Sequence, residues 1–336
     1  MEGHPGVTNL KWETVAKTNI GLEVGLLRNA IDLQIDWFKE NRRDIFQKRV
    51  NFPNSAGFVQ LPYANFGKVD NTGVDISLMV NKSLTKDLHI GVRGTFTYAK
   101  NKIIEQDEDM GKIGTNRQRT GHSVNQIFGL VADGLYTEAD FIDIENGILA
   151  DGLPVPEFKD QRNLKPGDIK YLDLDNNGII NSMDETAIGG TWDPEIIYGF
   201  GLSLAYKSID LGVNFQGSGR TYSMIGRGNE FMPGSNMGTT GNIYANALND
   251  RWKPDNPRQD AFYPRLTYGR DTHNSQSSTW WLKNMSMLRM KNLEVGYSFP
   301  KNWIRNIALS NARVFVRGTS LLIFTHFTLW DPAESS

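Results

Sequence analysis

The sequence contains no cysteine among its 336 residues. A disulfide framework, a catalytic thiolate and a cysteine-based zinc site are therefore excluded. It also has no run of about 18 apolar residues, so it predicts no transmembrane helix. Lysine and arginine form no basic stretch, and the formal net charge is only -2. A nucleic-acid partner is not expected, because nucleic-acid-binding surfaces gather basic residues on one face.

Glycine and aromatic residues, in contrast, are plentiful. There are 33 glycines, and aromatic residues make up 11% of the chain. This composition is too apolar and aromatic for a disordered chain. It is typical of a protein with many strands and many turns.

The apolar residues recur with a period of two, which indicates strands with one apolar and one polar face. Ile20, Leu22, Val24 and Leu26 alternate with polar residues and glycine. The same alternation recurs at residues 31–38, 74–81, 88–98, 196–204, 209–216, 293–299 and 314–316. Leu288 and Met290 are out of phase with Leu293, so we expect a β-bulge near Asn292. The sequence thus predicts eight strands.

Short and long connections alternate strictly between these strands. The short turns lie near residue 28 and at residues 83–87, 207–208 and 300–310, and the long loops at residues 47–70, 103–194 and 217–281. All the long loops therefore emerge at one end, as in outer-membrane barrels. Twelve residues tilted by about 40° span roughly 30 Å, close to the hydrocarbon thickness. A soluble β-sandwich is the alternative, but its strands usually have only five or six residues.

The predicted fold is therefore an all-β transmembrane antiparallel β-barrel with long extracellular loops. Eight strands would leave an interior filled by side chains, yet the loops are very long. No closing strand follows residues 330–332, and an open sheet edge cannot face lipid. Residues 1–6 also lack the features of a secretory signal. We expect the barrel to be completed by segments outside this sequence.

Residues 173–184 have the ligand spacing of an EF-hand-type calcium loop. Gly178 stands at position 6, where the chain turns sharply. Oxygen ligands are expected from Asp173, Asp175, Asn177, the Ile179 carbonyl, Asn181 and Asp184. Position 12 is Asp184 instead of glutamate, and no amphipathic helix precedes Asp173. We expect Ca²⁺ as a structural ion; a polar turn without metal is the alternative.

Several segments, in this order, resemble the C-terminal half of the SusC/RagA family of TonB-linked (TonB-dependent) outer-membrane transporters of Bacteroidetes. The matching segments are residues 10–14, 18–22, 36–38, 71–75, 129–134, 166–171, 251–252, 263–265, 288–292 and 296–297. The resemblance covers residues 1–336 as a partial barrel without plug domain and closing strand. Within it, residues 103–194 form a long extracellular loop that carries residues 173–184. Residues 217–281 form a second long loop.

The resemblance implies an importer of oligosaccharides or peptides in the bacterial outer membrane, in contact with lipid. In that family a barrel of about 22 strands is plugged by an N-terminal domain. A SusD-like surface lipoprotein covers the mouth, and the TonB complex pulls on the plug. Neither a plug nor a TonB-box segment lies within this sequence, so these residues do not carry energy coupling.

No catalytic constellation is visible, and an enzyme is not expected. The five histidines are scattered without ligand or triad spacing. For a sugar transporter, aromatic and arginine side chains on the loops are the candidate ligand contacts, because sugars stack on rings and bond to planar polar groups. The candidates are Trp252, Tyr263, Arg265, Trp280 and Trp281. Alternatively, these residues pack the loops on one another.

A second functional hypothesis comes from a different class of protein. A calcium-clipped surface adhesin or glycan-binding β-domain would also contain alternating strands and an acidic loop. It would be soluble without detergent and polar on both outer faces. The apolar stripes of the strands favour the outer-membrane transporter.

Overall fold

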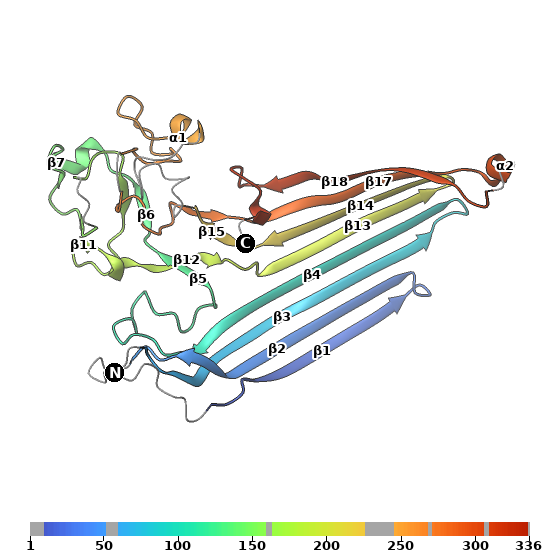
Figure 1. The fold of residues 1–336 in the computed structure, drawn as a ribbon, viewed down its shortest axis with the longest axis horizontal. Helices are drawn as coiled ribbons and strands as arrows, with labels where there is room; N and C mark the ends of the chain where they lie inside the picture. Colours follow the sequence, from blue (N-terminus) through green and yellow to red (C-terminus); the bar gives the residue numbers. More distant parts are fainter. Residues whose placement is uncertain are drawn as a thin grey trace.

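The computed structural model describes residues 10–51, 60–158, 163–225, 245–267, 271–305 and 309–334. Its main feature is a long eight-stranded antiparallel sheet in the order β1-β2-β3-β4-β13-β14-β17-β18 (Figure 1). The strands are β1 (Thr14–Leu26), β2 (Ile31–Lys48), β3 (Tyr63–Ser83), β4 (Leu88–Glu105), β13 (Ile196–Tyr206), β14 (Ile209–Gly219), β17 (Met287–Ser298) and β18 (Arg313–Thr325). Each of these eight strands pairs with the next one along the chain. They are the eight strands that the alternation predicts.

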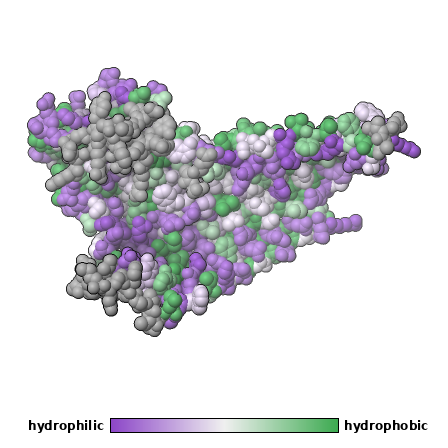
Figure 2. Space-filling model, viewed as in Figure 1, coloured by the Kyte–Doolittle hydropathy of each residue, from purple (hydrophilic) through white to green (hydrophobic). Residues whose placement is uncertain are grey.

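The register of the sheet places apolar residues side by side on one face. Ile20 pairs with Trp37, which pairs with Val74, and the row continues through Tyr98 to Ile196. Paired residues of neighbouring strands point to the same face, and side chains alternate between the two faces along each strand. This row of apolar residues therefore lies on one face. Among the described residues no second layer covers this face, and Figure 2 shows hydrophobic residues recurring along the strands.

The neighbouring row belongs to the other face. Gly21, Asp36, Asp75 and Thr97 are paired in turn. The Thr97 hydroxyl donates to an Asp75 carboxylate oxygen at 2.6 Å. One face of the sheet is therefore apolar and the other polar, as the wall of a water-filled barrel requires.

The short connections lie at one end of the sheet and the long ones at the other (Figure 1). The first turn holds Leu27, Arg28 and Asn29 at positive φ, and Lys207 has φ 52° in the tight turn before β14. Helix α2 (Lys301–Ile304) lies in the last short connection. The register shifts between Met290 and Asn292, which confirms the predicted bulge.

One boundary differs from the prediction. The first long loop was expected at residues 47–70, but β2 runs to Lys48 and β3 begins at Tyr63. Tyr63 pairs with Lys48 and Asp70 with Asn41. These paired segments are largely polar, so they carry no apolar alternation to reveal them. Part of the loop, residues 52–59, lies outside the described residues.

The second and third long connections fold together into a compact loop head, defined here as the described residues of 126–191 and 221–285. Its elements are β5 (Gln126–Gly129), β6 (Ala132–Leu135), β7 (Phe141–Asp143), β8 (Ile148–Leu149), β9 (Val155–Pro156), β10 (Ile169–Tyr171), β11 (Ile179–Ile180), β12 (Thr186–Thr191), β15 (Tyr222–Met224), β16 (Leu282–Asn284), α1 (Ala245–Asn249) and the 3₁₀ helices η2 (Glu138–Asp140) and η3 (Ser182–Asp184). A further 3₁₀ helix, η6 (Pro332–Glu334), follows β18. Of the helices in the described ranges, none has the length and apolarity to cross a membrane.

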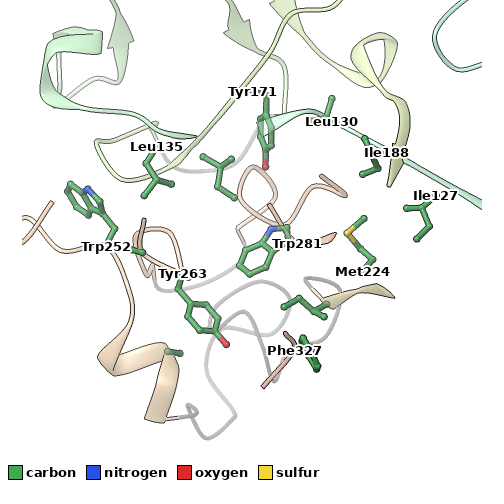
Figure 3. Packing of buried hydrophobic residues seen from close by; sticks show 14 of the residues in the cluster. Ile127, Leu130, Leu135, Tyr171, Ile188, Met224, Trp252, Tyr263, Trp281 and Phe327 are labelled. Atoms are coloured by element: carbon green, nitrogen blue, oxygen red, sulfur yellow. The ribbon is translucent and has the colours of Figure 1, made fainter. Parts of the chain in front are cut away.

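The buried hydrophobic cluster of the described residues lies in this loop head, together with Phe327 from the segment after β18 (Figure 3). Its largest fully buried side chains include Trp281, Tyr171 and Tyr263. Leu130 of the connection between β4 and β13 and Trp281 of the connection between β14 and β17 lie in the same core. Burial of this kind stabilises by roughly 1.5–3 kcal/mol per large side chain. The two loops therefore form one packed unit at the end of the sheet opposite the short turns (Figure 1).

Candidate functional site

The acidic loop of residues 173–184 brings three carboxylates together. Ligand atoms of Asp173, Asp175 and Asp184 all lie within 4.8 Å of one another. Asp184 is fully buried, and its two oxygens accept hydrogen bonds from the backbone N–H groups of Leu174 and Asn181, both at 2.8 Å. These bonds fix Asp184, the last residue of the loop, against the backbone of Leu174 and Asn181.

Local backbone geometry turns the chain around this cluster. Gly178 has φ 82°, a conformation that glycine adopts at little cost. Its N–H donates to Asp173 Oδ2 at 2.7 Å. Asp173 Oδ1 is buried and has no hydrogen-bond partner among the described residues. A buried carboxylate oxygen without a donor calls for a cation or an ordered water.

The electrostatics of the loop fit a hard cation. Burial, followed by the charges of Asp184 and Asp173, raises the pKa of Asp175. For Asp173, burial acts to raise the pKa, but backbone N–H groups, led by that of Gly178, outweigh it and lower the pKa. Clustered carboxylate oxygens are the ligands that Ca²⁺ prefers. The residues present therefore fit the expected ion.

The other expected ligands are less clearly aimed at the cluster. Asn177 Oδ1 accepts from the Ile179 N–H, and Asn181 Oδ1 accepts from the Met183 N–H, each at 2.7 Å. Ile179 begins β11, which pairs in parallel with β9. The structure thus assembles the three aspartates, while the two asparagine oxygens are engaged in local turns.

The five candidate substrate contacts have different surroundings. Trp252, Tyr263 and Trp281 are buried in the core of the loop head, with Trp281 at 0% exposure (Figure 3). Trp280 is partly buried, and its Nε1–H donates to the Phe262 carbonyl at 3.0 Å. Three of the five therefore pack the two loops together, which is the alternative that the sequence left open.

Arg265, the fifth candidate, holds a buried carboxylate. Its Nε and Nη2 lie 3.1 and 2.9 Å from the two oxygens of Asp168, which is 3% exposed. Asn274 donates from Nδ2 to both Asp168 and Asp271, at 2.9 Å each. Sequence reasoning missed Asp271, His273 and Asn274 because they lie in no motif and no periodic segment. They are identified only by their contacts in the folded structure.

The sheet and its loops together define a class of protein. Long antiparallel strands with one apolar face, and long connections gathered at one end, form the wall of an outer-membrane β-barrel. The chain is a segment of such a barrel, and its location is the outer membrane. No protein-family model matches the sequence.

Similar proteins support this assignment. The chain is 28% identical to the TonB-dependent receptor P26 of Formosa agariphila, over 99% of this chain and 32% of that protein. It is 24% identical to the TonB-dependent receptor SusC of Bacteroides thetaiotaomicron, over 98% of this chain and 30% of that protein. The chain therefore spans about a third of the length of these relatives and resembles the SusC type.

Solved structures show the same fold. The RagAB peptide importer in its open-open state superposes with a TM-score of 0.71 at 22% identity, over 98% of this chain and 33% of that one. Its closed-closed state superposes with a TM-score of 0.67 at 23% identity, over 96% and 33%. The fold of this chain thus matches about a third of that longer chain.

Proposed function

We propose that this chain forms part of the barrel wall and outer loops of a TonB-dependent importer of oligosaccharides or peptides. The observation that carries the proposal is the sheet itself, with its apolar face, its polar face and its loop head at one end. The relationship to TonB-dependent receptors over nearly the whole chain supports it. An adhesin has no need of the uncovered apolar face.

The polar face of the sheet would line the lumen. Near the short turns it is hollowed, with a volume of about 610 Å³. His89, Asp210, Asn292, Glu294 and Arg317 are among the lining residues. This hollow would face the plug domain that the TonB complex acts on. A SusD-like lipoprotein would cover the opposite end, where the loop head lies.

The acidic loop would hold a structural Ca²⁺. Asp173, Asp175 and Asp184 would be its ligands, with carbonyl and water oxygens completing the six to eight that calcium takes. The ion would neutralise the mutual repulsion of the three carboxylates. Its role would be to clip residues 173–184 to the rest of the loop head.

Fractionation of the source cell tests the proposed function. An antibody against this chain should detect a protein in the outer membrane on the order of 100 kDa, because 37.8 kDa of chain spans 32% of the Formosa receptor. Deleting the gene should abolish uptake of one class of oligosaccharide or peptide. A soluble protein, or unchanged uptake of every such nutrient, would contradict the importer.

A further inference from the structure

The apolar face of the sheet ends at a row of lysines on the side of the long connections. On β4 the alternating side chains of this face run from Leu88 to Tyr98, and the next two positions are Lys100 and Lys102. Ten residues at about 3.3 Å each, tilted by about 40°, rise roughly 25 Å, which is the height of the apolar band of outer-membrane barrels. The lysines therefore begin where the hydrocarbon of the membrane ends.

The strand pairing extends this boundary across the neighbouring strands. The row next to the apolar row of Trp37 and Tyr98 lies on the same face and consists of Thr18, Lys39, Thr72 and Lys100. The following row on that face consists of Ala16, Asn41, Asp70 and Lys102. These two rows thus place three lysines and one aspartate on the outward face of the wall.

Two carboxylates at this boundary lie beside cations. Asp70 Oδ1 accepts a hydrogen bond from Arg43 Nη1 at 2.7 Å. Glu195 lies beside both Arg220 and Lys100, with N–O distances of 3.3 and 3.9 Å. These contacts use the two acids without leaving any negative charge over for the remaining lysines.

Lys39 and Lys102 have no such carboxylate. Both side chains are exposed, and within the described ranges neither forms an ion pair. Neighbouring strands lie about 4.8 Å apart, so Lys39 and Lys100 are separated by roughly 10 Å across Thr72. Lysine stems are long and flexible, so two ammonium groups can reach one phosphate from this distance. The Thr72 hydroxyl between them is a further donor.

The polar face at the same height has no excess of positive charge. Lys17 Nζ lies 2.5 Å from a carboxylate oxygen of Glu40. Their row continues through Asn71 and Asn101, which are uncharged. The unbalanced charge therefore lies on the face that contacts lipid and not on the face that lines the lumen.

From this arrangement we infer a binding site for the phosphate group of an outer-leaflet lipid, formed by Lys39, Lys100 and Lys102 with Thr72. The long connections of outer-membrane barrels face the cell exterior, so the site lies in the outer leaflet. The acyl chains of the lipid lie on the apolar face below the site, and the lysines neutralise its phosphate. The inference goes beyond nutrient import, because it concerns the lipid that surrounds the barrel.

The test uses the detergent-solubilised full-length protein and native mass spectrometry, which counts bound lipid. The protein is titrated with lipid A that carries its phosphates and with the same lipid after the phosphates have been removed. The variants are Lys39→Gln, Lys102→Gln and the two combined, since glutamine keeps much of the length but removes the charge. Lys17→Gln is the matched control, because this lysine lies at the same height on the polar face.

The dissociation constant for the phosphorylated lipid should rise about fivefold in each single variant and roughly 25-fold in the double variant, the effect of one basic residue each near anionic headgroups. It should remain unchanged in Lys17→Gln, and wild type and double variant should bind the dephosphorylated lipid equally weakly. Equal affinity of the wild type for the two lipids would overturn the site. So would unchanged affinity in the double variant, or an equal loss in Lys17→Gln. None of these results bears on nutrient uptake, which the gene deletion tests separately.

Discussion

Arg265 and Asp168 form a two-point ion pair across 97 residues of sequence, with Nε–Oδ1 and Nη2–Oδ2 distances of 3.1 and 2.9 Å. The pair joins the two connections that form the loop head, since Asp168 lies between β4 and β13 and Arg265 between β14 and β17. The Arg265 N–H also donates to the Gly167 carbonyl at 2.8 Å. The integrity of the loop head therefore depends on this contact.

Replacing Arg265 with alanine should destabilise the loop head by about 3 kcal/mol, because it leaves a buried carboxylate without its cation. Hydrogen exchange of the full-length protein should accelerate across residues 163–171. Arg258→Ala is the control, since its partners Asp250 and Asp260 are both exposed and such pairs contribute under about 1 kcal/mol. Equal exchange in the two variants would contradict the role given to Arg265.

Gly167 should not tolerate a side chain. Its φ is 90°, and an added Cβ would lie 2.3 Å from the Trp252 indole. Gly167→Ala combines backbone strain of about 1 kcal/mol or more with a displaced core tryptophan. Gly152 has a similar φ of 85° but open space around it, so Gly152→Ala isolates the backbone strain. The midpoint temperature of loop-head unfolding, followed by tryptophan fluorescence, should fall further in Gly167→Ala than in Gly152→Ala.

Calcium should bind the acidic loop with measurable heat in titration calorimetry. Asp173→Asn and Asp184→Asn should each weaken binding at least tenfold, because each removes a charged ligand. Asp143→Asn is the control: Asp143 is outside the cluster and accepts from Asn146 at 2.6 Å. Ca²⁺ binding that survives both cluster variants would place the ion elsewhere.

Acid should loosen the turn that follows β4. For Glu108, burial acts to raise the pKa, but the Thr120 hydroxyl and the N–H groups of Arg119 and Thr120 outweigh it and lower the pKa. Because the pKa of Glu108 is lower in the folded than in the unfolded state, its charged carboxylate stabilises the turn fully at pH values above the unfolded-state pKa of about 4.3. That contribution is lost as the pH falls through the folded-state pKa. Hydrogen exchange across residues 106–121, corrected for its intrinsic pH dependence, should show this loss.

Glu108→Gln is the matching variant. Glutamine has no charge to titrate, so the exchange of residues 106–121 should be faster near neutral pH and should lose its acid dependence. If wild type and Glu108→Gln respond equally to acid, another group controls this turn.

The sheet was predictable from the sequence, whereas the loop head was not. Alternation such as Ile20, Leu22 and Val24 specifies a strand and its apolar face, and the phase break before Leu293 specifies the bulge. The burial of Trp252, Tyr263 and Trp281 follows from contacts between loops some hundred residues apart, which no local pattern encodes. The spacing of residues 173–184 predicted which carboxylates meet, because those ligands are close in sequence. His273 and Asn274 could not be predicted, because their contacts with Ile169 and Asp168 are with residues about a hundred positions away in the sequence.

The central claim, that this chain is a wall of a membrane barrel, is tested by two adjacent residues of β13. Leu202 shares the apolar face with Phe200 and Leu204, while Ser203 lies on the polar face, where its hydroxyl donates to the Gly91 carbonyl at 3.3 Å. Because the chain has no cysteine of its own, Leu202→Cys and Ser203→Cys give single reporters once any others in the full protein are replaced.

Isolated outer membranes carrying each variant are treated with a charged, membrane-impermeant maleimide. The account predicts that Ser203→Cys is labelled and that Leu202→Cys reacts only with an apolar maleimide or after extraction in denaturant. Equal labelling of the two cysteines by the charged reagent in intact membranes would mean that both faces are in water, and the barrel would be contradicted.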